Sequence, residues 1–257
     1  MHVRLSKLHG AGNDFLVLVD LDGRTPLTDA VARALCDRRL GVGADGLLRA
    51  WRGGLGSDLT MDLRNADGTV AEMSGNGIRC LVHAAIRSRA IDGPVVTVDT
   101  LDGQKRVEVK EVDRHTITAR VEMGQARVRQ AIVSGIGLKA SLVDMGNPHL
   151  VVLDDAVDPV DLDRLGPEHP DLNVEVIRIR PDGDLDLVVW ERGVGRTLAC
   201  GTGTCAAAAA AQGWGIAGSD VVVHNPGGLL RVELAEGQAV LEGPSTFVAD
   251  VEVSWPS

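Results

Sequence analysis

The sequence has 257 residues, of which 44% are hydrophobic, enough for one large core or two smaller ones. Its formal net charge of −10 argues against nucleic acid or a membrane surface as the main partner, because both require a basic patch. No apolar stretch has the length of a signal peptide or a membrane helix, so we expect a cytoplasmic protein. The four cysteines, Cys36, Cys80, Cys200 and Cys205, form no C-x-x-C pair, so we expect reduced thiols and no metal site.

Alternating apolar residues predict strands, and a longer apolar run after a glycine-rich turn predicts a helix. In the first half of the chain the predicted elements are, in order, strands at 16–19 and 59–63, a helix at 78–90, and strands at 95–98 and 106–109. In the second half they are strands at 150–153 and 185–190, a helix at 204–212 and a strand at 221–223. The alanine run at 206–211 has high helix propensity and no polar face, which is typical of a buried helix.

Three segments of the first half recur in the same order in the second half. The segment 12–20 resembles 146–154, Ser74-Gly75-Asn76-Gly77 resembles Cys200-Gly201-Thr202-Gly203, and 97–109 resembles 222–234. We therefore predict an α+β fold of two pseudo-symmetric copies, each a curved, mostly antiparallel sheet around a central apolar helix. The copies would be residues 1–121, joined by the last strand at 248–257, and residues 122–247. The active site would lie in the cleft between them.

Each glycine-rich turn lies just before a predicted helix. The first turn of a helix carries unpaired backbone N–H groups and the positive end of the dipole, so it can bind an anion such as a carboxylate. Taken alone, either turn fits an ordinary helix cap, but the duplication favours a shared site in which Gly75, Asn76, Gly201 and Thr202 line the carboxylate.

Residues 74 and 200 would then flank the α-carbon of a bound amino acid. Racemisation needs one group that removes the α-proton from one face and another that delivers a proton to the opposite face. A thiol suits this task, because its pKa is about 8.5 and the N-terminus of a helix should lower it.

Several motifs of the chain resemble those of the diaminopimelate epimerase family. They run through most of the sequence, and they are His9-Gly10-Ala11-Gly12-Asn13-Asp14-Phe15, Gly41-Val42-Gly43-Ala44-Asp45-Gly46, Arg64-Asn65-Ala66-Asp67-Gly68, Glu72 to Gly77, Gly146-Asn147-Pro148-His149, Asn173-Val174-Glu175 and Glu191 to Gly203. The resemblance implies a cofactor-independent enzyme that interconverts LL- and meso-diaminopimelate on the route to lysine and peptidoglycan, usually as a homodimer.

The resemblance also assigns residues to the distal, non-reacting end of this small amino-acid substrate: Asn13, Asn65, Asn147, Asn173, Glu191 and Arg192. The fork of Arg192 suits a carboxylate, whereas Glu191 and amide oxygens suit an ammonium group. His149 is compatible both with a structural role and with support of Glu191 or Cys200.

The chain departs from the family at Ser74, where the family has its first catalytic cysteine. A serine hydroxyl is close in acidity to water, whose pKa is about 15.7. It is therefore roughly seven units weaker than a thiol, a difference of about 9 kcal/mol. The serine fits an engineered change, a natural one-base enzyme, or a different use of the hydroxyl. Arg196 stands where an acidic or amide residue is more usual.

Three alternatives remain open from the sequence: a related amino-acid racemase, a lyase that dehydrates a 3-hydroxy amino acid, and a diaminopimelate-binding homologue with impaired turnover. The lyase would have little use for Arg192. The binding protein would hold diaminopimelate without proton exchange at Cys200.

Overall fold

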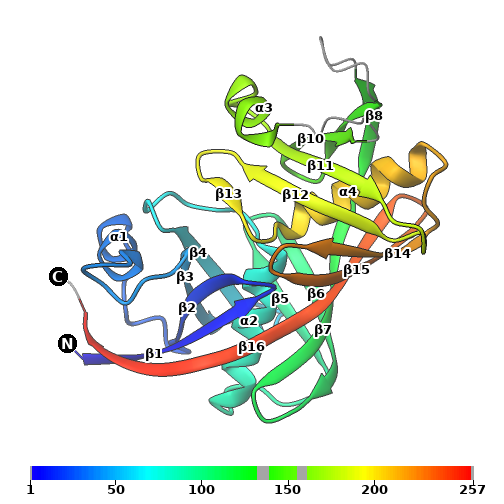
Figure 1. Ribbon diagram of the computed structural model, residues 1–257. Coiled ribbons are helices and arrows are strands. Elements are labelled where there is room, and N and C mark those ends of the chain that lie inside the picture. Colours follow the sequence, from blue (N-terminus) through cyan, green and yellow to red (C-terminus); the bar gives the residue numbers. More distant parts are fainter. Residues whose placement is uncertain (1, 132–138, 155–160, 256–257) are drawn as a thin grey trace. The chain divides into compact units, whose positions relative to one another are not determined.

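Strands dominate the fold. The computed structural model describes residues 2–131, 139–154 and 161–255 (Figure 1). The first half of the chain contains β1 (His2–Gly10), β2 (Asn13–Val19), α1 (Asp29–Cys36), β3 (Gly46–Arg52), β4 (Leu59–Asn65), α2 (Gly75–Arg87), β5 (Val95–Thr100), β6 (Gly103–Val112) and β7 (Thr116–Gln125). The second half contains β8 (Arg127–Ala131), β9 (Ala140–Asp144), β10 (Pro148–Leu153), α3 (Leu162–Glu168), β11 (Asn173–Ile179), β12 (Leu185–Glu191), β13 (Gly195–Thr197), α4 (Gly201–Gly213), β14 (Asp220–Asn225), β15 (Gly228–Ala235) and β16 (Gln238–Ser254).

The chain forms two compact units, residues 1–121 with 244–257, and residues 122–243. In both units strands come first, then a short helix, more strands, a 13-residue helix and further strands; two strands precede each helix in the first unit, whereas β8 to β10 precede α3 and β11 to β13 precede α4 in the second. The fold is thus β-rich and divided into two parts, as the sequence predicts. None of the helices in the described ranges is long and apolar enough to cross a membrane.

The pairing pattern is also repeated. In the first unit the strand order is β1-β2-β3-β4-β5-β6-β7-β16, and β16 pairs back to β1. Two of these pairs are parallel, β2 with β3 and β4 with β5. In the second unit the order is β16-β15-β14-β12-β11-β10-β9-β8, and its parallel pairs are β10 with β11 and β12 with β14. Each short helix is therefore the crossover of the first parallel pair in its unit.

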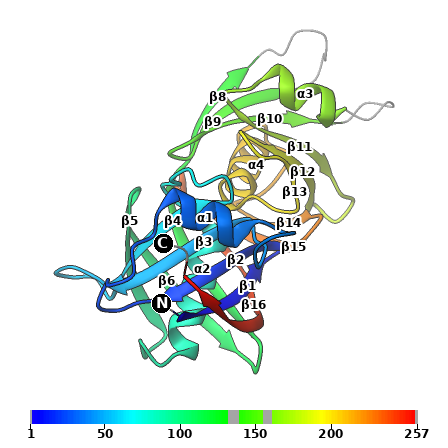
Figure 2. The same cartoon turned by 90° about the vertical axis from the view of Figure 1, so that its left-hand side faces the viewer.

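The two 13-residue helices form the centre of the packing within their units. Helix α2 contacts β1, β2, β3 and β4, and α4 contacts strands on its own unit's sheet, β9 to β12 among them (Figure 2). Residues 206–211 of α4 are all buried, as their composition predicts. Helix α2 differs from the expectation of an apolar helix, because Arg79 is fully buried and His83 is 2% exposed.

The two short helices were not among the predicted elements. Thr28 caps α1 by accepting a hydrogen bond from the Val31 backbone, and the apolar residues of α1 form one buried face. Asp161 caps α3 in the same way, with its side chain accepting from the backbone N–H groups of Asp163 and Arg164. Both helices are too short for a clear helical period, which explains why the sequence pattern did not reveal them.

Candidate active site

Ser74 and Cys200 are the N-cap residues of the two long helices, α2 and α4. Both have an extended backbone, and both side chains accept a hydrogen bond from the third residue of their helix. The Gly77 backbone N–H donates to Ser74 Oγ at 3.0 Å, and the Gly203 N–H donates to Cys200 Sγ at 3.4 Å. The helices begin at Gly75 and Gly201, earlier than the predicted Ile78 and Thr204, because the glycine-rich turns are themselves the first turns.

In the first unit a buried arginine organises the start of α2. Arg79 donates to Gly75 O at 2.9 Å and to Asn76 Oδ1 at 2.6 Å, and it is fully buried. Asn76, which is 1% exposed, donates in turn to Asn13 Oδ1 at 3.4 Å. Three predicted site residues, Asn13, Gly75 and Asn76, thus lie in one bonded group that includes a guanidinium charge.

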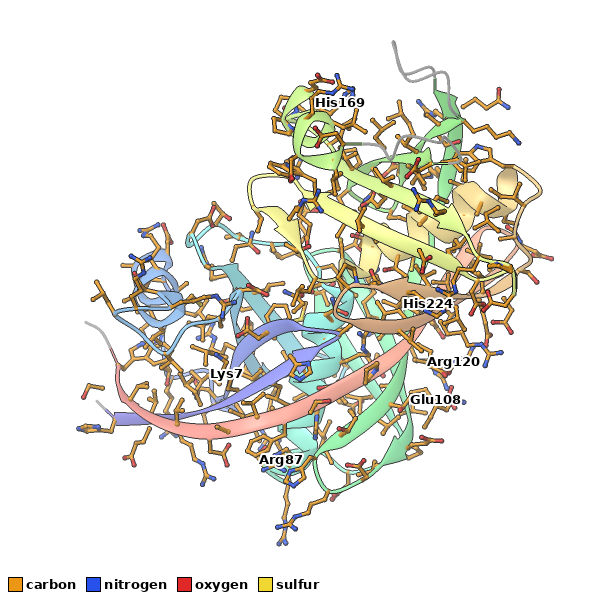
Figure 3. The ribbon with its side chains drawn as sticks, in the orientation of Figure 1. Lys7, Arg87, Glu108, Arg120, His169 and His224 are labelled. Carbon is orange, nitrogen blue, oxygen red and sulfur yellow. The ribbon has the colours of Figure 1, made fainter. Side chains whose placement is uncertain are left out.

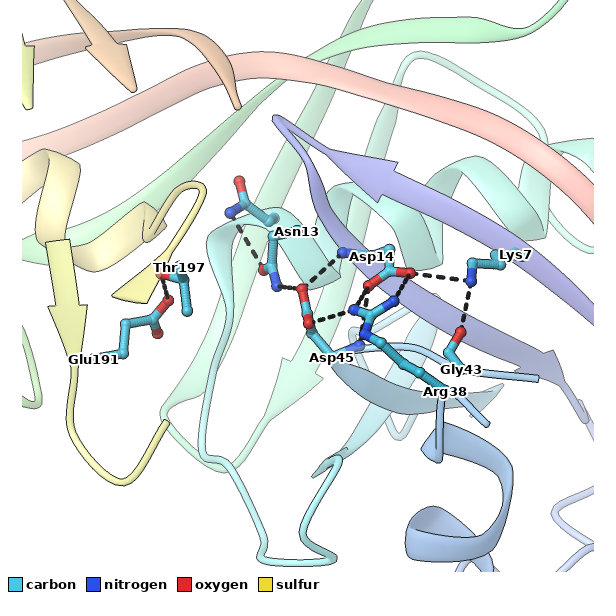
Figure 4. A network of polar contacts seen from close by, with 9 residues as sticks. Lys7, Asn13, Asp14, Arg38, Gly43, Asp45, Glu191 and Thr197 are labelled. Carbon is cyan, nitrogen blue, oxygen red and sulfur yellow. Dashed lines mark hydrogen bonds and ion pairs between the residues drawn. The ribbon is translucent and has the colours of Figure 1, made fainter. Parts of the chain in front are cut away.

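Asn13 is held from its other side by a charged network (Figure 4). Its Nδ2 donates to Asp45 Oδ2 at 2.8 Å, and Arg38 bridges Asp45 and Asp14. Lys7 adds a second cation at 3.1 Å from Asp14. Burial alone would raise the pKa of Asp14, but hydrogen bonds from Arg38 and Lys7 outweigh it and keep this pKa below its usual value. The network therefore fixes the orientation of the Asn13 amide.

Asn65 lies at the end of β4, in a tight turn. Its Nδ2 donates to Thr69 Oγ1 at 3.0 Å, and its backbone N–H donates to Thr69 O. These local bonds are those of a turn residue.

In the second unit Cys200 is 7% exposed, and its thiol has acidic neighbours. Burial raises the pKa of Cys200 well above its ordinary value, and the charges of Glu191 and Glu175 raise it further. Hydrogen bonds from Thr202 and the Gly203 backbone lower it, but by less. The helix N-terminus thus lowers this pKa through the Gly203 N–H, as expected, but burial and the two carboxylates outweigh that effect.

A line of polar side chains connects to Cys200. Thr202 Oγ1 lies 3.4 Å from Cys200 Sγ, and Asn147 Nδ2 lies 3.3 Å from Thr202 Oγ1. His149 is bonded through Nε2 to Asn147 Oδ1 at 2.9 Å, and through Nδ1 to Glu175 Oε1 at 2.7 Å. No role was predicted for Glu175. The only sequence signal was its place beside Asn173 in one of the motifs.

Asn173, Glu191 and Arg192 meet where β11 and β12 lie side by side. The Asn173 side chain accepts a hydrogen bond from the Arg192 backbone N–H at 3.0 Å and donates one to Pro148 O at 3.2 Å. Its amide therefore links the start of β11 to the start of β10 and to the residue after β12. Glu191 accepts a hydrogen bond from the Thr197 hydroxyl (Figure 4). The Arg192 side chain is exposed and makes no hydrogen bond or ion pair with any residue in the described ranges. It is therefore available to bind an external carboxylate.

Arg196, at a position where an acidic or amide residue is more usual, forms an ion pair with Asp163. Its Nε lies 2.5 Å from Asp163 Oδ1, in the first turn of α3. Both side chains are largely exposed, so the pair contributes little to stability and mainly links β13 to α3. Other polar side chains, such as His224 on β14 and Lys7 on β1, are labelled in Figure 3.

No metal centre or disulfide accompanies these groups in the part of the chain that the structure describes. Residues 2–131, 139–154 and 161–255 contain no cluster of three His, Cys, Asp or Glu residues that could hold a metal ion. All four cysteines are free and buried, and Cys36 and Cys205 are 2% and 0% exposed. Those two are small core residues.

Comparison with known proteins covers almost the whole chain. The family profile described as "Diaminopimelate epimerase" matches residues 5–129 and 141–248. A diaminopimelate epimerase of Mycobacterium sp. (strain KMS) is 38% identical over an alignment of 286 positions, gaps included, which covers 98% of this chain and 97% of the relative. One of Corynebacterium glutamicum (strain R) is 35% identical over 276 residues, covering 98% of each.

Solved structures share the fold at lower sequence identity. A phenazine biosynthesis protein of the PhzF family from Bacillus anthracis superposes with a TM-score of 0.79 at 12% identity, covering 99% of each chain. A probable proline racemase from Agrobacterium radiobacter K84, with bound carbonate, gives 0.76 at 17% identity, covering 99% of this chain and 93% of the other. At these identities the likeness describes the fold alone.

Proposed function

Because the chain belongs to the diaminopimelate epimerase family, we propose that it acts on the α-carbon of diaminopimelate with Cys200 as its only strong base. The function is that of the family, an isomerase that interconverts the LL and meso forms by removing and returning the α-proton. The observation that carries the residue assignment is the matched capping of α2 and α4 by Ser74 and Cys200.

In each of the two pseudo-symmetric copies the sheet would curve around its long helix, α2 or α4. The carboxylate at the reacting end of the substrate would accept hydrogen bonds from the first-turn backbone N–H groups at Gly75, Asn76, Gly201 and Thr202, where the helix dipoles favour negative charge. The same groups would stabilise the charge that builds up when the α-proton leaves. No step uses a cofactor.

The distal, non-reacting end of diaminopimelate would be bound by six residues: Asn13, Asn65, Asn147, Asn173, Glu191 and Arg192. The unpaired guanidinium of Arg192 suits the distal carboxylate. Glu191 suits an ammonium group, and its negative charge is one cause of the raised pKa of Cys200. An ammonium bound to Glu191 would offset that charge, so the reactive thiolate would form mainly in the substrate complex.

Ser74 retains the capping bond of the family's cysteine position but not its acidity. The proton that Cys200 removes would therefore return mostly from Cys200 itself or from water on the same face, and one epimer would exchange its proton faster than it inverts. We also propose that the protein is cytoplasmic, since its four free thiols suit a reducing compartment. We propose further that it is a homodimer, as family members usually are.

The test is α-proton exchange in heavy water, with LL- and meso-diaminopimelate followed separately by NMR, for the chain and for Ser74→Cys. We expect exchange of one epimer with slow inversion, and faster inversion in Ser74→Cys. Cys200→Ser serves as the control and should abolish exchange. If neither epimer exchanges in either form, the substrate is wrong, and 3-hydroxy amino acids should be tried for elimination.

A further inference from the structure

Five side chains of the second unit form one continuous line that ends at the Cys200 sulfur. The neighbouring atoms are 2.7 Å apart between Glu175 and His149, 2.9 Å between His149 and Asn147, 3.3 Å between Asn147 and Thr202, and 3.4 Å between Thr202 and Cys200. The residues come from β10, β11, α4 and the turn before β10. Glu175 and His149 are both fully buried, so the far end of the line is shielded from water.

The donor and acceptor chemistry of the side chains gives this line a direction. A carboxylate oxygen can only accept, so His149 Nδ1 is the donor towards Glu175 Oε1. Asn147 Oδ1 also only accepts, so His149 Nε2 is the donor towards it. Both ring nitrogens of His149 therefore face acceptor oxygens, an arrangement that suits a ring with a hydrogen on each nitrogen.

The remaining links follow from this state. With its oxygen turned to His149, the Asn147 amide directs Nδ2 to Thr202 Oγ1, which therefore accepts. The hydroxyl hydrogen of Thr202 is left to point at the sulfur, where it stabilises a thiolate. If His149 lost its Nε2 hydrogen, the Asn147 amide would turn round, and its oxygen would take the Thr202 hydrogen away from the sulfur.

We propose that Glu175 is a positioning residue that keeps His149 doubly protonated and so directs the Thr202 hydroxyl hydrogen onto Cys200. The proposal rests on the function proposed above for its catalytic consequence, but the hydrogen-bond line itself can be tested without substrate. Glu175 does not touch the reacting atoms, and it directs the Thr202 hydrogen through His149 and Asn147.

The packing around Glu175 holds its carboxylate in place. A Cβ at Gly203 would lie 2.4 Å from Glu175 Oε1, so the carboxylate lies directly against the first turn of α4. The second oxygen, Oε2, is buried without a hydrogen-bond partner among the described residues. A half-satisfied buried carboxylate is costly, and a balancing imidazolium reduces that cost.

Glu175 affects the pKa of Cys200 in two opposite ways, so the direction in which this pKa shifts when Glu175 is replaced tests the proposal. As a nearby negative charge it raises that pKa, as Glu191 on β12 also does. Through His149, Asn147 and Thr202 it lowers the same pKa. Neutralising Glu175 would lower the pKa of Cys200 if only the charge of Glu175 mattered. It would raise this pKa if the hydrogen bonds through His149, Asn147 and Thr202 have the larger effect.

The experiment is a pH titration of the ultraviolet absorbance of the thiolate, taken as the difference between the chain and its Cys200→Ser variant. We expect Glu175→Gln, which keeps the shape beside Gly203, to reduce the thiolate fraction at a given pH about tenfold, a shift of about one pH unit. Glu236→Gln, in an exposed turn, is the matched control and should leave the curve unchanged. A higher thiolate fraction in Glu175→Gln, or no change, overturns the proposal.

Asn147→Leu provides a second test that leaves the charge of Glu175 intact and remains informative if Glu175→Gln fails to fold. It interrupts the line, so we expect the same loss of thiolate, and no further loss when both changes are combined. An unchanged titration in Asn147→Leu would refute the directed line.

Activity then separates the two proposals. In the Ser74→Cys background, Glu175→Gln should lower kcat for α-proton exchange, since the Thr202 hydrogen would no longer point at the Cys200 sulfur. If the titrations behave as expected but diaminopimelate is not turned over, only the substrate assignment fails.

Discussion

Gly203→Ala should destabilise the chain, although alanine usually favours a helix. The added methyl group would lie 2.4 Å from Glu175 Oε1 and 3.1 Å from Glu175 Cδ, well inside ordinary contact distance. Glu175 is fully buried and bonded to His149, so it has no open space into which to move. Overpacking of this kind costs about 1–3 kcal/mol. The better helix propensity of alanine, about 1 kcal/mol, offsets only part of it.

The duplicated architecture supplies a matched control. Gly77 occupies the same place in α2, but a Cβ there would meet Ser74 Cβ at 3.1 Å and Ser74 Oγ at 3.2 Å, which small shifts can relieve. We therefore expect Gly77→Ala to change the free energy of unfolding by less than about 1 kcal/mol. The assay is urea unfolding of both variants, compared at unchanged m-value.

A double-mutant cycle isolates the cause. In a Glu175→Ala background the clash partner is gone, so Gly203→Ala should become neutral or stabilising, with a coupling of about 1–3 kcal/mol. Equal stability of Gly203→Ala and Gly77→Ala, or a cycle with no coupling, would show that the carboxylate does not lie against the helix as described.

Three further predictions concern single side chains. Ser74→Ala should cost about 1 kcal/mol in urea unfolding, because the N–H of Gly77 loses its capping acceptor at 3.0 Å; an unchanged midpoint would mean that the cap contributes nothing. Burial and the charge of Arg87 lower the pKa of His83 to about 4, so the unfolded chain protonates first and stability should fall as the pH drops from about 6.5 towards 4. His83→Gln should flatten that part of the stability curve, and an identical curve would contradict the assignment. Arg192→Ala should weaken diaminopimelate binding about 100-fold without affecting stability, and unchanged affinity in a binding titration would refute the substrate.

Several features of the fold could be predicted because they depend on local patterns. Strand β4 alternates apolar and polar residues, every second residue from Leu185 to Val189 in β12 is apolar and buried, and the alanine run of α4 has high helix propensity. The repeated glycine-rich turns indicated two equivalent helix starts, and Ser74 and Cys200 occupy equivalent cap positions. The start of each helix was predicted too late, since glycines at the first turn weaken the helical signal.

The candidate site could be predicted only in part. The motifs supplied Cys200, Arg192 and the asparagines, since these residues recur in a recognisable order. They did not reveal that Asn65 bonds within its own turn, that Asn173 bonds to Pro148 and Arg192, or that the buried Arg79 donates to Asn76. A buried charge has no sequence signature of its own, because its burial depends on strands far away in the chain.

The sequence by itself determined the family, the repeated order of elements and the residue at each helix start, because each depends on residue types and their spacing. Only the tertiary structure decided the electrostatic state of those residues. It placed the Glu175 carboxylate against Gly203, and it put Cys200 in a buried, acidic setting that raises its pKa. Such effects depend on distance and on exclusion of water, which arise from the way separate strands meet and not from the order of residues along any one of them.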